Sequence, residues 1–87
     1  MFSGLYELEV LIIIGNRISQ IDADTFKGLV NVKSIDLFNN HLELVAKDAF
    51  AANENLENVN LGGSMIENRL KYELQKFNPK INFIFFV

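Results

Sequence analysis

One pattern of apolar residues recurs three times along the chain, each time 24 residues further on. Residues 8–18, 32–42 and 56–66 all follow L-x-x-L-x-L-x-x-N-x-L, where L stands for any aliphatic residue. The third copy departs from it at one position, with Ser64 in place of the asparagine. Self-similarity at this period is typical of repeat architectures, in which each copy buries its apolar face against the next copy.

The apolar register continues between these segments, where Phe26 matches Phe50 and Asp24 matches Asp48. The period therefore divides the chain without gaps. We expect one domain spanning residues 1–87. It would consist of a partial copy at 1–7, complete copies at 8–31, 32–55 and 56–79, and a C-terminal strand at 80–87. In each of the last two copies one position that should be apolar holds a polar residue instead, Asn53 in the second copy and Arg69 in the third.

Within each copy, Leu11 and Ile13 alternate with variable residues, as a short β-strand with one buried face requires. The equivalent pairs in the later copies are Ile35/Leu37 and Val59/Leu61. Stacking the copies makes these strands a parallel sheet over one continuous core. Phe26 and Phe50 should then stack as a column on the convex side.

Asn16 and Asn40 follow the strands at the point where the chain bends away. An asparagine amide can bond backbone groups of its own turn and of a neighbouring turn. We therefore interpret both residues as structural.

These three segments, together with residues 22–29, resemble the leucine-rich repeat family, in the 24-residue form common in extracellular proteins such as Toll-like receptors and Slit-like proteins. The resemblance implies an α/β fold: a right-handed solenoid with a short parallel sheet on its concave face. It also implies a protein-recognition module that is not an enzyme and that lies outside the cell or in a receptor ectodomain, although a cytoplasmic location stays open. The motif is specific for the fold and weak for function.

Residues 2–5 are in register with residues 26–29, so the chain begins inside a repeat, and no polar cap precedes the first core layer. Solenoids need such a cap. We expect a fragment of a longer protein. The alternative is that a partner or a second copy covers this end.

The C-terminal segment predicts a closing helix and strand. Ser64-x-x-Glu67 has the form of a capping box, and Leu70, Leu74 and Phe77 lie on one helical face. Asn78-Pro79 would end the helix, with Lys76 and Lys80 near its negative end. Residues 81–87 read as a strand in register with the earlier strands.

The composition gives little support for catalysis, metal binding or nucleic-acid binding. The chain has no cysteine, one histidine and a net charge of −3. It offers no cofactor site, no catalytic constellation and no basic patch for nucleic acid. His41 lacks a second ligand or a nucleophile. Asp22 and Asp24 are too few for a calcium cage, and Asp24 and Asp48 more simply cap the turns before Phe26 and Phe50. The longest apolar runs are too short to insert in a membrane.

The outward positions of the strands are the remaining candidate site. They form three columns along the sheet, and several of their residues are apolar, whereas a solvated face is usually polar. The candidate partner-binding residues are Ile12, Ile14, Asp36, Phe38, Asn60, Ile84 and Phe86.

We favour recognition of an unidentified protein partner through this concave face. Alternatively, these residues simply suit a strand or are covered by flanking segments. Two other functions stay open: a structural segment of a larger receptor-type ectodomain, and a domain that self-associates through its uncapped N-terminal end.

Overall fold

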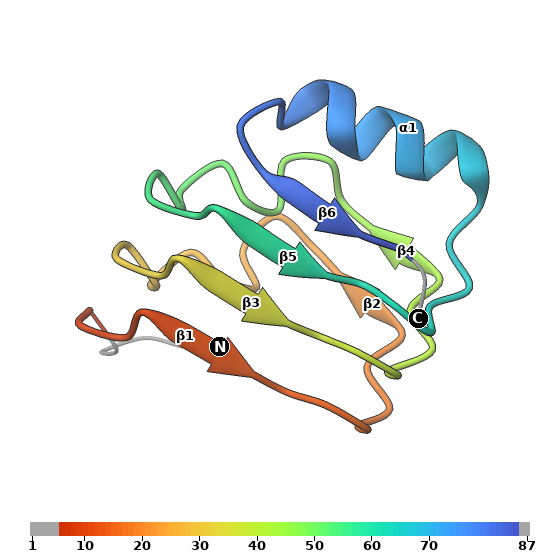
Figure 1. Ribbon diagram of the computed structural model, residues 1–87, viewed down its shortest axis with the longest axis horizontal. Helices are drawn as coiled ribbons and strands as arrows, with labels where there is room; N and C mark the ends of the chain where they lie inside the picture. Colours follow the sequence, from red (N-terminus) through yellow and green to blue (C-terminus); the bar gives the residue numbers. More distant parts are fainter. Residues whose placement is uncertain (1–5, 86–87) are drawn as a thin grey trace.

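A four-stranded parallel sheet forms one side of the protein. The computed structural model describes residues 6–85. The strands are β1 (Val10–Ile12), β3 (Ser34–Asp36), β5 (Asn58–Asn60) and β6 (Asn82–Ile84), in that order (Figure 1). Leu11 pairs with Ile35, Ile35 with Val59, and Val59 with Phe83. The 24-residue register that the sequence predicts is thus confirmed, although the last strand is shorter than residues 81–87.

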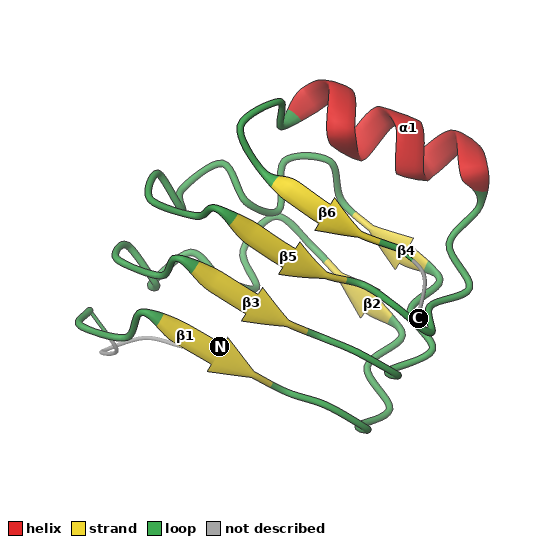
Figure 2. Ribbon diagram, viewed as in Figure 1, coloured by secondary structure: helices red, strands yellow, loops and turns green. Residues whose placement is uncertain are grey.

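A second, two-stranded parallel sheet lies on the opposite side of the core (Figure 2). It consists of β2 (Gln20–Ile21) and β4 (Leu44–Val45). The sequence did not predict these strands, because two residues are too few to show an alternation. The residues 24 positions after β4 are Asn68 and Arg69, which begin helix α1 (Asn68–Phe77). The helix therefore takes the place of a third strand in this sheet.

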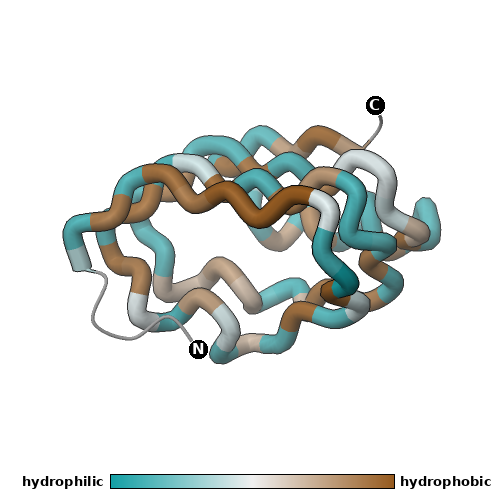
Figure 3. Tube along the Cα trace, turned by 90° about the horizontal axis from the view of Figure 1, so that it is seen from below, coloured by the Kyte–Doolittle hydropathy of each residue, from teal (hydrophilic) through white to brown (hydrophobic). Residues whose placement is uncertain are grey.

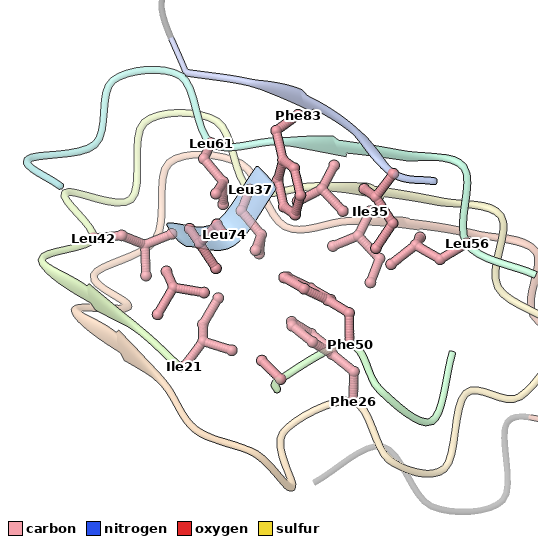
Figure 4. Packing of buried hydrophobic residues seen from close by; sticks show 14 of the residues in the cluster. Ile21, Phe26, Ile35, Leu37, Leu42, Phe50, Leu56, Leu61, Leu74 and Phe83 are labelled. Atoms are coloured by element: carbon pink, nitrogen blue, oxygen red, sulfur yellow. The ribbon is translucent and has the colours of Figure 1, made fainter. Parts of the chain in front are cut away.

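The apolar positions of all copies meet between the two sheets (Figure 4). Phe50 and Leu37 are buried as predicted, with exposed fractions of 2% and 1%. The Phe26 and Phe50 rings are stacked, with centroids 5.9 Å apart and planes 9° apart. Phe83 extends the predicted column by one ring, 5.9 Å from Phe50 and tilted.

Each copy forms one flattened coil, and successive coils lie over one another (Figure 3). The first coil is the least well covered. Its apolar residues Leu8, Leu11, Ile13 and Ile18 are only partly buried, whereas the equivalent residues of the second coil are buried. Leu5, which we also assign to this first layer, lies outside the described residues.

Asn40 ties two coils together, in agreement with its structural interpretation. Its side chain is buried, and its Nδ2 donates to the carbonyl oxygens of Ile13 and Leu37, in the preceding and in its own coil. Asn16 is different, because it is exposed and donates only to Ile14 O, at 3.4 Å. Asn53, an exception in the apolar pattern, is buried and donates to Phe26 O and Leu29 O, both at 2.9 Å.

The turns after the strands repeat an unusual backbone conformation. Gly15, Asn39 and Gly63 are spaced by 24 residues and have φ angles of 72°, 62° and 74°. Only glycine adopts this left-handed region without strain, and asparagine tolerates it better than most residues. At Gly63, a Cβ atom would also lie 3.1 Å from Asn39 Cα, so the two turns pack closely.

Two predicted caps are wrong. In the turn before Phe26 the capping side chain is Asp22, whose Oδ1 accepts from Asp24 N at 2.9 Å and from the Thr25 hydroxyl. Asp22 is two residues earlier than the predicted Asp24, and its side chain reaches the N–H group of Asp24 itself. At α1 the N-cap is Glu67, without a side-chain cap bond.

Ser64 lies in the preceding turn, where its N–H donates to Leu61 O, so it is too far from α1 to cap it. The helix ends at Asn78 as predicted, with Lys76 in its last turn. Of the predicted apolar face, Leu74 is buried and Leu70 half-buried, but Phe77 is exposed.

Candidate protein-binding face

The outer face of the four-stranded sheet brings the predicted site residues into columns. Ile12, Asp36, Asn60 and Ile84 pair across successive strands. Beyond the strands the ladder continues, because Gly15 N donates to Phe38 O at 3.1 Å and Asn39 N to Gly62 O at 2.8 Å. Ile14 and Phe38 are therefore neighbours in the next column. Phe86, which we assign to that column, lies outside the described residues.

Exposed apolar side chains gather at the β1 end of this face. Ile12 is 61% exposed, Val10 53% and Ile14 49%. Phe38, just after the adjacent strand β3, is half-buried. Val10 was not among the predicted site residues, because the rest of its column is polar: Ser34, Asn58 and Asn82. Its exposure adds it to the patch, which we call the β1 patch: Val10, Ile12, Ile14 and Phe38.

Asp36 and Asn60 form a polar strip beside the β1 patch. Asp36 Oδ1 accepts a hydrogen bond from Phe38 N at 3.1 Å, and Asn60 Oδ1 accepts one from Gly62 N at 2.9 Å. These bonds fix the backbone where it leaves β3 and β5, so Oδ1 of each side chain is already used to stabilise the fold. Each side chain is only half-buried and keeps further polar capacity.

Ile84 lies at the other edge of the sheet. Its side chain is 38% exposed, and Asp36 and Asn60 separate it from Ile12. Neighbouring strands are about 4.8 Å apart, so the separation across three steps is about 14 Å. The structure thus brings Ile12, Ile14 and Phe38 together but leaves Ile84 apart from them.

Reactive side chains do not cluster in the part of the chain that the structure describes. No group of three or more His, Cys, Asp or Glu residues there could hold a metal ion. His41 is exposed, with a φ of 58° in the turn before Leu42. Helix α1 has ten residues, and within residues 6–85 no helix has the length and apolar character needed to span a bilayer.

Comparison with known families agrees with this architecture. The family model described as leucine rich repeat matches residues 6–66. The chain therefore belongs to the leucine-rich repeat family, whose domains are generally protein–protein interaction modules. A search of curated proteins finds no match to this chain.

Proposed function

We propose that the chain is a right-handed solenoid segment that recognises a protein partner through the four-stranded sheet, on its concave side. The β1 patch carries the proposal, because three aliphatic side chains that are about half exposed or more lie together on β1 and immediately after it. Isolated exposed apolar residues are ordinary on protein surfaces, whereas a contiguous group marks an interaction site.

The surroundings of the β1 patch fit a binding site. Interfaces usually combine an apolar centre with a polar rim, and a few central residues supply most of the binding energy. Asp36 and Asn60 provide the rim on the β3 side. Phe38 is the aromatic member of the patch and, being half-buried, is partly fixed before binding. Fixing it beforehand lowers the entropy cost of association.

The test measures partner affinity with variants of the β1 patch. Partners recovered on the immobilised chain from tissue that expresses it are titrated against wild type, Phe38→Ala, and the double variant Ile12→Ser/Ile14→Ser. Each variant should weaken binding by about 2 kcal/mol. Melting temperatures should change little for the double variant, because both side chains are largely exposed.

Val30→Ser is the matched control, since Val30 is 44% exposed and lies outside the four-stranded sheet. Unchanged affinity in both patch variants would move the site off this face. Unfolding of Phe38→Ala would mean that Phe38 belongs to the core.

A second candidate function is self-association at the β1 end. There the apolar residues of the first coil are only partly buried, and β1 pairs with β3 alone among the described strands. Exposed strand edges readily pair with other chains. Sedimentation equilibrium would detect such pairing, and Ile12→Lys should abolish it.

By resemblance to the family's 24-residue form, we also propose an extracellular or receptor-ectodomain location, which localisation of the tagged full-length protein would test.

A further inference from the structure

A strip of surface along α1 changes the sign of its charge from one end to the other. Residues 43–47 run beside α1 in the same direction (Figure 1). At one end Met65 N donates to Leu42 O at 2.7 Å, and at the other end Asn78 Nδ2 donates to Lys47 O at 3.1 Å. We call residues 43–47 and 65–77 the α1 strip.

The end of the α1 strip nearest the helix N-terminus is acidic with an apolar floor. An open groove of about 590 Å³ lies there, and its lining holds three carboxylates and one cation: Glu43, Leu44, Met65, Glu67, Arg69, Leu70 and Glu73. Leu44 is 58% exposed and Met65 64%. Among the residues that the structure describes, neither Glu43 nor Glu67 forms an ion pair.

The other end of the α1 strip is basic and carries an exposed aromatic ring. Phe77 is 47% exposed, and Lys47 Nζ lies 5.8 Å from the centre of its ring. Lys76 stands in the last turn of α1, 5.9 Å from the centre of the Tyr72 ring. Both cations flank an apolar protrusion, whereas the carboxylates at the opposite end flank an apolar groove.

Between the two ends, Arg69 and Glu73 neutralise each other, with Arg69 Nε 3.4 Å from Glu73 Oε1. A surface with opposite charges at its two ends is complementary to itself after a two-fold rotation. We propose that the α1 strip is the interface with a second copy of this chain. The two α1 helices lie antiparallel, and each Phe77 rests in the other copy's groove, against Leu44 and Met65.

Both halves of this interface form at once because the two copies are identical. Glu67 and Lys76 are nine residues apart, which is about 14 Å along a helix. When the acidic end of one copy faces the basic end of the other, the reverse pair is brought together by the same rotation. The surface lies outside the four-stranded sheet, so a dimer of this kind leaves the β1 patch free for its own partner.

We expect a weak and salt-sensitive dimer. The strip offers only a few exposed apolar side chains to bury, which indicates a dissociation constant on the order of 100 µM. Dissolved salt screens exposed charge pairs. Raising NaCl from about 50 mM to about 500 mM shortens the Debye length roughly threefold, so the dimer should weaken over this range.

A charge-swap experiment tests the interface. Sedimentation equilibrium between 10 µM and 1 mM compares wild type with Lys47→Glu/Lys76→Glu, whose strip is acidic at both ends, and with Glu43→Lys/Glu67→Lys, whose strip is basic at both ends. Each variant alone should dimerise at least about tenfold more weakly, because like charges then face each other. An equimolar mixture of the two variants should associate again as a heterodimer.

The control Lys27→Glu/Glu57→Lys changes two exposed charges outside the strip and should dimerise as wild type does. Circular dichroism verifies that every variant folds. A wild-type chain that stays monomeric at 1 mM overturns the proposal, as does a mixture that fails to associate. Dimerisation lost on Ile12→Lys but kept in both strip variants would place the contact at β1 instead. None of these results depends on partner binding by the β1 patch, which is measured separately.

Discussion

The buried asparagines show that a single side chain can bond two coils of the chain. Asn40 and Asn53 each donate hydrogen bonds to two backbone carbonyls, at least one of them in the preceding coil. Buried carbonyl groups need such partners, because leaving them unbonded costs free energy. The pattern L-x-x-L-x-L-x-x-N-x-L predicts this role for Asn40. It does not predict it for Asn53, which only interrupts an apolar series.

Removal of the Asn40 amide should therefore be costly. Asn40→Ala leaves the carbonyls of Ile13 and Leu37 without their donor inside the protein, so we expect a loss of about 2–3 kcal/mol in the free energy of unfolding. Asn16→Ala at the equivalent exposed position should cost less than about 0.5 kcal/mol. Urea denaturation followed by circular dichroism measures both, and equal losses would contradict a specific role for Asn40.

A strand or helix of this fold can be predicted from the sequence when its residues repeat with the 24-residue period or alternate in polarity over enough positions to be distinguished from chance. The four strands of the larger sheet recur with the 24-residue period and alternate in polarity, so their register is correctly predicted. Strands β2 and β4 have two residues each and offer no alternation. The beginning of α1 was misplaced because the capping-box spacing at Ser64 occurs by chance within a turn.

The candidate binding face is likewise predictable where it depends on the 24-residue period. Ile12, Ile14 and Phe38 could be predicted as neighbours because the period places them in adjacent columns. The sequence also places Val10 in an outward column, but we left it out of the site because Ser34, Asn58 and Asn82, the other residues of that column, are polar.

The aromatic column joins the two sides of the core, because Phe26 and Phe50 lie in the turns after the smaller sheet and Phe83 lies in β6 of the larger sheet. Phe50 lies between Phe26 and Phe83, 5.9 Å from each ring centre, and is 2% exposed. Phe50→Ala should lower the free energy of unfolding by about 3–5 kcal/mol, since it leaves a cavity and removes two ring contacts.

Phe77→Ala is the control, because half of that side chain is already exposed; its loss should be about 1 kcal/mol. Both variants are compared at low protein concentration by urea denaturation. A loss below about 1 kcal/mol for Phe50→Ala would show that Phe50 is not a core residue.

At the scale of the whole molecule, protection from solvent increases from the first coil to the second. Ile13, Leu37 and Leu61 are equivalent residues, and each donates its N–H to the following strand, at 2.8, 2.9 and 2.6 Å. Ile13 is half-buried, whereas Leu37 and Leu61 are buried. The same bond is therefore present once at a half-buried residue and twice at buried residues.

Hydrogen exchange should rank these three amides. Local opening costs least where few apolar contacts hold a segment, so Ile13 should exchange at least about tenfold faster than Leu37 and Leu61. Heteronuclear NMR at a concentration at which the chain is monomeric gives the three rates directly. If the Ile13 amide exchanged as slowly as those of Leu37 and Leu61, the first coil would be as stable as the others, and its partial burial would not weaken it.

The constant spacing of the strands also limits how the length of this chain can change. Leu11, Ile35, Val59 and Phe83 occupy one row of the sheet because the same number of residues separates each pair. Insertion of one residue between two of them would turn inward side chains outward or strain a turn such as that at Gly63, where there is no spare room. Insertion of a whole 24-residue unit restores every alignment. The molecule can therefore grow or shrink in evolution by whole coils far more easily than by single residues, and each added coil would lengthen the sheet without altering the surfaces at either end.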